Sequence, residues 1–193
     1  DESIFREYDI RGIAPDQINE QSIKVIATAI AKKCHDKKVN ELALGRDGRL
    51  SGSEILNSLS KELLFHGINI VNVGIVTSPL LYFAAKKLDS KSGVMITGSH
   101  NPKNYNGFKI VINDKPVSGI EILNLISNKS NYSKNPGCEI IKKDLMDEYI
   151  AEVVSQASKH SKKIKVVVDC GNGSAGEIAP KLMRALGHEV VEL

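Results

Sequence analysis

The sequence lacks tryptophan and has only three cysteines among its 193 residues. Cys34, Cys138 and Cys170 are odd in number and widely spaced, so they predict no disulfide framework and no C-x-x-C pair. This use of cysteine is typical of a reducing compartment, and we expect a cytoplasmic protein. No apolar run in the sequence is long enough to span a bilayer, and we expect no signal peptide and no membrane partner.

No charge of one sign dominates, since 26 basic residues stand against 23 acidic ones for a formal net charge of +3. Basic and acidic side chains are interspersed, which is typical of a solvated surface rather than a nucleic-acid-binding face. We therefore expect no nucleic-acid partner, whereas a small anionic substrate is compatible with this balance. The length fits one large domain, or one domain plus part of a second.

Helical and strand patterns alternate along the chain, which is typical of an α/β protein. Ser51 and Glu54 form an S-x-x-E sequence that predicts a capping box, and Gly67 predicts the end of the same helix. Asn19 and Ser118 are candidate caps for two further helices. The patterns predict helices at 19–33, 51–66, from 78 and from 118, and strands at 41–45, 69–73, 94–97 and 108–112.

A second unit is predicted from residue 164, after a polar surface loop at 127–137, a helix at 144–158 and a linker at 158–163. Its pattern is a strand at 165–169, a helix at 175–186 and a strand at 189–193. Strand, helix and strand with short turns predict a parallel pair with a right-handed crossover. One such unit cannot close a core, so we expect more of the protein to follow Leu193.

The segment that carries chemistry is Met95 to Ile110, MITGSHNPKNYNGFKI, in which an apolar strand enters a polar loop. Gly98 permits a sharp turn and the close approach of a ligand, while Pro102 stiffens the loop. Ser99 would then lie at the C-terminal edge of a sheet, where α/β proteins bind ligands. Lys109, on the next strand, could reach back toward it. Taken alone, such a serine is more often part of an ordinary turn.

A hydrolase is disfavoured, because G-x-S-x-G is absent and the adjacent side chains of Ser99 and His100 generally diverge.

The whole segment resembles the phosphoserine loop of the α-D-phosphohexomutase superfamily, through Thr97 to Pro102 and Tyr105 to Lys109. It is most similar to bacterial phosphomannomutase/phosphoglucomutase, with phosphoglucosamine mutase as a near alternative. Residues 5–12, 45–51 and 169–176 resemble further segments of that superfamily; in 45–51 the Asp and Arg are expected to satisfy backbone groups of the loop.

The resemblance implies a mixed, mostly parallel sheet flanked by helices over residues 1–145, carrying the phosphoserine loop. Residues 146–193 would be a linker helix and an incomplete second α/β domain. It also implies a hexose phosphate substrate, of mannose or glucose, and hexose 1,6-bisphosphate as intermediate and activator. The protein is expected to be a monomer or a weak dimer.

By the same resemblance, phospho-Ser99 gives its phosphoryl group to a sugar hydroxyl and later receives another. Lys109 and Arg11 are expected to be cations beside the phosphate, and His100 to bond the phosphate or move a proton. Tyr8 and Asn101 are expected to contact the substrate.

Magnesium is the expected metal, held in the superfamily between the phosphoserine oxygen and three Asp residues. Only Ser99 of these ligands is present in this sequence, and the sugar-binding loops of the later domains are absent from it. This chain alone is therefore expected to be inactive. The competing class is a non-catalytic α/β fragment that binds phosphosugars or a partner protein.

Overall fold

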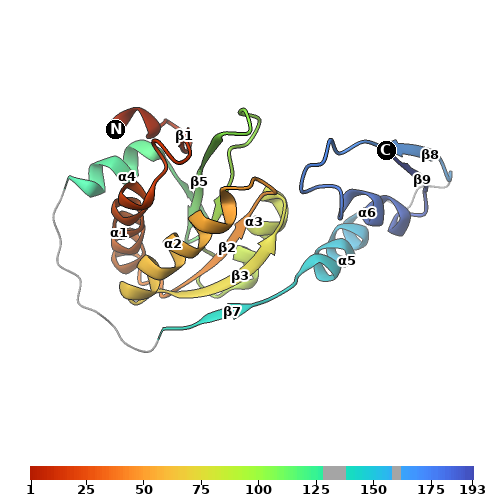
Figure 1. Ribbon diagram of the computed structural model, residues 1–193. Coiled ribbons are helices and arrows are strands. Elements are labelled where there is room, and N and C mark those ends of the chain that lie inside the picture. The colour runs from red at the N-terminus through yellow and green to blue at the C-terminus, as the bar shows by residue number, and fades with distance from the viewer. Residues whose placement is uncertain (128–137, 158–161) are drawn as a thin grey trace.

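A larger and a smaller α/β unit make up the fold in the computed structural model (Figure 1). It describes residues 1–127, 138–157 and 162–193, so most of the predicted surface loop and of the predicted linker lies outside the described residues. The order of elements confirms the predicted α/β alternation. The division of the chain at residue 145 stays a prediction.

The larger unit is built on a 7-stranded mixed sheet with the order β1-β5-β4-β2-β3-β7, in which β6 also pairs with β5. Strands β4, β2, β3 and β7 are mutually parallel, and β5 is antiparallel to β4, β1 and β6. Only β5 therefore runs against the common direction, which confirms the mostly parallel sheet. The strands are β1 Ile10–Ile13, β2 Glu41–Arg46, β3 Asn69–Ile75, β4 Gly93–Ile96, β5 Tyr105–Ile112, β6 Lys115–Val117 and β7 Ile140–Lys142.

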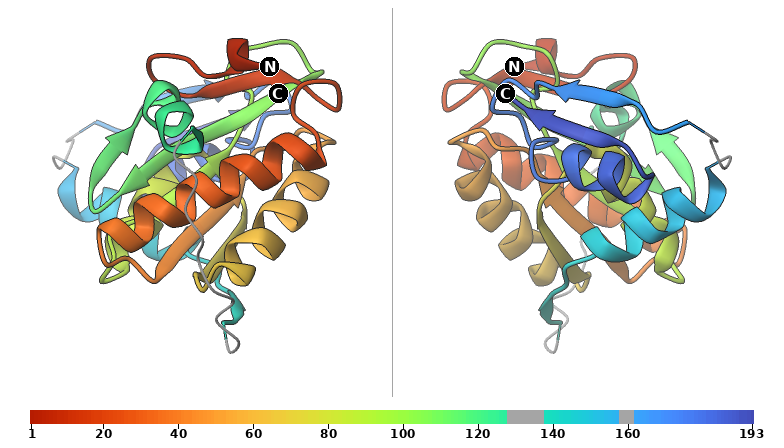
Figure 2. Two further views of the ribbon diagram at one scale, coloured as in Figure 1. Left: turned by 90° about the vertical axis from the view of Figure 1, so that its left-hand side faces the viewer. Right: turned by 90° about the vertical axis from the view of Figure 1, so that its right-hand side faces the viewer.

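Helices cover both faces of this sheet, because alternate residues of a buried strand point to opposite sides. Leu42 and Leu44 of β2 join one apolar cluster with α1 and α2, whereas Ala43 between them joins a second cluster with α3. Figure 2 shows α1 and α2 side by side across one face. The helices of this unit are α1 Glu20–Asp36, α2 Gly52–Phe65, α3 Ser78–Lys87 and α4 Gly119–Ile126, preceded by a short 3-10 helix at Glu2–Ile4.

Two of the three predicted helix caps are confirmed and one is wrong. Asn19 Oδ1 accepts a hydrogen bond from the Ser22 amide at 3.0 Å, and Ser118 Oγ accepts one from the Glu121 amide at 3.0 Å. Ser51 makes no side-chain capping bond; its Oγ accepts a hydrogen bond from Asn106 Nδ2 at 2.9 Å. Ser51 thus bonds a side chain on β5 in place of the backbone amide within its own helix that a capping box would use.

The smaller unit confirms the predicted parallel strand pair, β8 Lys165–Val168 with β9 Glu189–Glu192. Its helix α6 spans only Ala179–Ala185, shorter than predicted, because turns occupy the residues directly before Ala179. Helix α5, Met146–Gln156, lies between the two units and contacts both α3 and α6. Phe83 of α3 meets Tyr149 of α5 edge to face, with ring centroids 5.4 Å apart.

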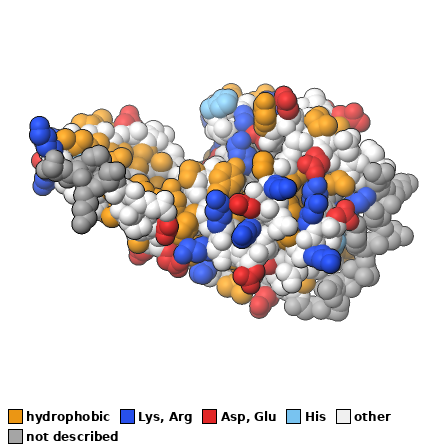
Figure 3. Space-filling model, turned by 180° about the vertical axis from the view of Figure 1, so that it is seen from behind, with side chains coloured by type: hydrophobic (Ala, Val, Ile, Leu, Met, Phe, Trp, Pro, Cys, Tyr) orange, Lys and Arg blue, Asp and Glu red, His pale blue; other side chains and the backbone are white. Residues whose placement is uncertain are grey.

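The face behind the view of Figure 1 carries basic and acidic side chains interspersed with apolar ones (Figure 3). Among the residues that the structure describes, none of the helices combines the length and the apolar character that a membrane span requires.

Candidate active site

Ser99 lies on an exposed loop, residues 97–104, that follows β4; we call it the Ser99 loop. The backbone φ of Ser99 is +54°, in the left-handed region, which residues other than glycine adopt uncommonly. The Ser99 amide donates a hydrogen bond to Thr97 Oγ1 at 2.8 Å, and the Thr97 hydroxyl donates to Asp47 Oδ2 at 2.7 Å. Strained conformations that the surroundings maintain are a recognised feature of functional sites.

Arg49 braces this loop by donating hydrogen bonds to three of its backbone carbonyls and to that of Tyr105, the first residue of β5. The oxygens are those of Ser99 and Asn101, at 2.9 and 2.7 Å from Nη2, and of Pro102 and Tyr105, at 2.5 and 2.9 Å from Nη1. Carbonyls engaged by a guanidinium cannot turn their negative ends toward an anion on the serine. The predicted support of the loop by the 45–51 segment is thus present in the structure.

Gly98 is needed for this bracing. A Cβ atom there would lie 2.5 Å from Arg49 Cζ and 2.7 Å from the Tyr105 carbonyl oxygen. The sequence predicted that Gly98 lets a ligand approach the backbone. In the structure it is the Arg49 guanidinium that occupies the space.

Two cations beside the loop share a single buried carboxylate oxygen. Asp9 Oδ2 accepts hydrogen bonds from Arg11 Nε and Nη2 at 2.9 and 2.7 Å and from Lys109 Nζ at 2.9 Å. Arg11 Nη1 also donates to Asn101 Oδ1 at 2.7 Å, which links this pair to the Ser99 loop. We call Asp9, Arg11, Asn101 and Lys109 the Asp9 cluster.

The charge state of the cluster follows from these contacts. Burial of the Asp9 carboxyl, which is only 3% exposed, raises its pKa. Hydrogen bonds and charge from Lys109 and Arg11 outweigh that effect, so the pKa of Asp9 lies below its ordinary value. Asp9 is therefore a carboxylate at neutral pH, with two cations fixed on it.

The pairing of β1 with β5 places the cluster. Arg11 lies opposite Gly107 and Ile10 opposite Phe108, so Asp9 and Lys109 continue the same antiparallel register. A Cβ atom on Gly107 would lie 1.9 Å from the Ile10 carbonyl oxygen. Glycine at this position thus lets the edge strand approach closely enough to carry Arg11 to the site.

The structure brings some of the predicted site residues together and leaves others apart. Arg11, Asn101 and Lys109 meet in the Asp9 cluster. Ser99 Oγ lies 3.5 Å from His100 Nδ1, the outer limit of a hydrogen bond, and both side chains are exposed. Tyr8 is 80% exposed, and no side-chain bond joins it to the other site residues among those described.

Comparison with known proteins now identifies the family. The model of phosphoglucomutase/phosphomannomutase, alpha/beta/alpha domain I, matches residues 2–135. The chain belongs to this family. It is 44% identical over 193 residues to a phosphomannomutase/phosphoglucomutase of Pseudomonas putida, covering 100% of this chain and 42% of the relative. It is 40% identical to a phosphoglucomutase of Neisseria gonorrhoeae, covering 98% of this chain and 42% of that protein. The chain thus spans less than half the length of these mutases.

Solved structures agree with this assignment. A crystal structure of a phosphoglucomutase/phosphomannomutase family protein from Burkholderia thailandensis superposes with a TM-score of 0.90 at 34% identity, covering 100% of this chain and 44% of that one. A putative phosphomannomutase from Thermus thermophilus shares the fold, with a TM-score of 0.82 at 20% identity, over 98% of this chain and 46% of that one.

Within residues 1–127, 138–157 and 162–193, the acidic side chains do not form a magnesium site by themselves. No group of three or more His, Cys, Asp or Glu side chains in the described parts is arranged to hold a metal ion. Asp9 is held by Arg11 and Lys109, and Asp47 Oδ2 by Arg49 and Thr97. Ser99, through a phosphate, stays the expected contribution to metal binding.

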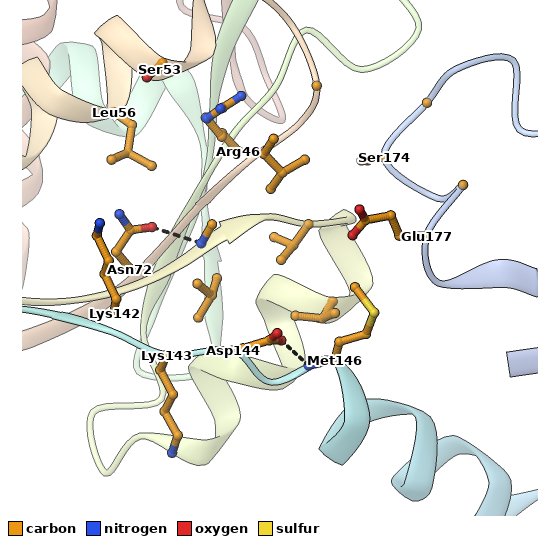
Figure 4. A pocket seen from close by; sticks show the side chains of 18 of the residues that line it. Arg46, Ser53, Leu56, Asn72, Lys142, Lys143, Asp144, Met146, Ser174 and Glu177 are labelled. Carbon is orange, nitrogen blue, oxygen red and sulfur yellow. Dashed lines mark hydrogen bonds between the residues drawn. The ribbon is translucent and has the colours of Figure 1, made fainter. Parts of the chain in front are cut away.

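A cavity of about 900 Å³ lies where β2 and β3 end and the segment before α5 passes (Figure 4). Arg46, Asn72 and Lys142 line it from the larger unit, and Glu177 lines it from the smaller one. None of the six predicted site residues belongs to its lining. The cavity lining and the predicted site residues therefore do not overlap, although Gly48, between Asp47 and Arg49, also lines the cavity.

Asp9 was not predicted as a site residue, although it lies within the 5–12 segment. The available signal was a carboxylate two residues before Arg11, directly ahead of strand β1. It was too weak to use, because its meaning depends on Lys109, which is 100 residues away.

Proposed function

We propose that the complete protein carrying this chain is a hexose phosphate mutase. It transfers a phosphoryl group between the 1- and 6-hydroxyls of mannose or glucose phosphate through phospho-Ser99. The observation that supports this most is the exposed serine in a left-handed conformation on a loop whose carbonyls Arg49 binds. The loop presents the hydroxyl to a ligand while its backbone stays fixed.

In the proposed reaction the bond between phosphorus and Ser99 Oγ breaks as a bond to a sugar hydroxyl oxygen forms. The sugar hydroxyl loses its proton, and the serine hydroxyl is regenerated. The product is a hexose 1,6-bisphosphate, which returns its other phosphoryl group to Ser99 in the reverse of this step. Catalysis of such transfers depends mainly on positioning and on stabilising the charge on the phosphoryl oxygens.

The Asp9 cluster supplies positive charge for this step. Arg11 suits two phosphoryl oxygens at once through its planar fork, whereas Lys109 acts as a compact point charge. His100 is proposed to bond the phosphate or to move a proton, since its ring nitrogen already approaches Ser99 Oγ. Tyr8 and Asn101 are proposed to contact the sugar phosphate. The side-chain oxygen Oδ1 of Asn101 accepts a hydrogen bond from Arg11, which leaves the side-chain nitrogen Nδ2 for that contact.

The decisive experiment is to locate phosphate on the complete protein after purification. Intact-mass measurement followed by peptide mapping is expected to find one phosphate, on Ser99. The reason is that a mutase of this kind must rest with its serine loaded before it can give a phosphoryl group away. Phosphate found only at other residues, with Ser99 always bare, would reject the proposal in favour of a non-catalytic fragment.

Arg49→Ala is expected to lower the turnover of the complete protein by about 10²-fold, because a displacement of about 1 Å in a catalytic group has that effect. Arg49→Lys should recover only part of the loss, since an ammonium has three donors and no fixed fork. Steady-state kinetics of both variants would test this. Equal activity of Arg49→Ala and wild type would show that the loop keeps its shape without the brace.

A further inference from the structure

Asp9 differs from Asp47, the other carboxylate near the Ser99 loop, because it accepts hydrogen bonds from two cationic side chains. Its Oδ2 atom takes three hydrogen bonds from two cations that come from different strands. The carboxyl is almost completely buried, whereas the cations are 14% and 27% exposed, for Arg11 and Lys109 respectively. The anion is thus withdrawn from solvent and the cations partly face it.

The hydrogen bonds to Asp9 leave donors of both cations unused. Among the described residues, Arg11 bonds Asp9 through Nε and Nη2 and Asn101 through Nη1, which leaves two of its five N–H donors. Lys109 bonds only Asp9, which leaves two of its three. Each cation is therefore fixed at one side and has donors left for the oxygens of an anion.

We propose that Asp9 is a positioning residue for phosphoryl transfer, which holds Arg11 and Lys109 as a pair and competes with phosphate for them. This rests on the proposed function of Ser99. Without the carboxylate, both long side chains are free to collapse onto a phosphate group. With it, they meet the phosphate at fixed positions, and the net charge of the three side chains is +1 rather than +2.

The competition predicts an unusual kinetic signature. Asp9→Asn keeps an acceptor oxygen in place but removes the negative charge, so the cations should bind ground-state phosphates more tightly and less precisely. We expect kcat of the complete protein to fall between about 10- and 100-fold, as for a misplaced catalytic group. The KM for the hexose phosphate should fall as well. A purely structural role of Asp9 would lower the amount of folded enzyme without lowering KM.

The matched control is Glu121→Gln, which removes one carboxylate charge from the ion pair that Glu121 forms with Lys33 between α4 and α1. This variant should leave kcat and KM unchanged. In an Arg11→Ala background, the effect of Asp9→Asn should shrink, because one of the two cations through which Asp9 acts is gone.

Three results would overturn the inference: kcat of Asp9→Asn unchanged, KM raised, or the same effect of Asp9→Asn with and without Arg11. Failure of the proposed function would be seen separately, as wild-type protein that never carries phosphate on Ser99. Should Asp9→Asn not fold, NMR of the unaltered protein decides with inorganic phosphate as the probe. The Arg11 Nε–H signal should stay protected from exchange while phosphate shifts the Arg11 and Lys109 signals; loss of that protection, or no shift, would refute the proposal.

Discussion

Ser99→Ala is expected to reduce turnover of the complete protein by at least about 10⁴-fold, as expected when the group that forms the covalent bond is removed. Alanine has no hydroxyl to carry the phosphoryl group, and no other serine shares the braced loop. The measurement is a coupled assay of hexose 1-phosphate conversion to 6-phosphate in the presence of Mg²⁺ and hexose 1,6-bisphosphate.

Ser53→Ala provides the control for that substitution. Ser53 is exposed on α2, and the same atom is removed outside the Ser99 loop, so turnover should stay at the wild-type value. Folding of both variants is checked by circular dichroism. Sustained turnover by Ser99→Ala, above the level of contaminating enzyme, would mean that another group carries the phosphoryl.

Lys109→Ala is expected to lower kcat by about 10²–10³-fold, the usual effect of removing one group that stabilises transition-state charge. Its effect on stability should be smaller, because Lys109 is 27% exposed and Arg11 still bonds Asp9. The two effects are separated by measuring steady-state kinetics and urea unfolding on the same preparations.

Lys115→Ala is the matched control, since it removes the same charge from an exposed position on the neighbouring strand β6. Neither its kinetics nor its unfolding midpoint should change appreciably. If Lys109→Ala kept wild-type kinetics, Lys109 would have to be removed from the site.

Most of the fold could be predicted because its signals are local. Apolar periodicity located α1 and β2, and Gly67, with its φ of +82°, ends the turn after α2 as expected. Strands β6 and β7 were missed because each has three residues, too few to show a period of two. They exist through their pairing with β5 and β3, which a local pattern does not contain.

The site was predictable to the extent that one segment encodes it. The motif around Ser99 indicated an exposed serine with a lysine on the next strand, and both are found there. The roles of Arg49 and Asp9 could not be predicted, because they depend on contacts between residues far apart in the sequence. Arg49 is 50 residues from Ser99, and Lys109 is 100 residues from Asp9. Ser51 failed as a cap for the same reason, since its partner Asn106 is 55 residues away.

The brace on the Ser99 loop also affects how the chain meets proteases. Exposed loop tips are usually the first sites to be nicked, and Lys103 offers trypsin an exposed basic residue there. Cleavage requires the segment to open locally, and opening this one means releasing the carbonyls of Ser99, Asn101, Pro102 and Tyr105 from Arg49 together. We therefore expect this exposed loop to resist digestion better than its exposure alone predicts, because a single guanidinium holds its backbone.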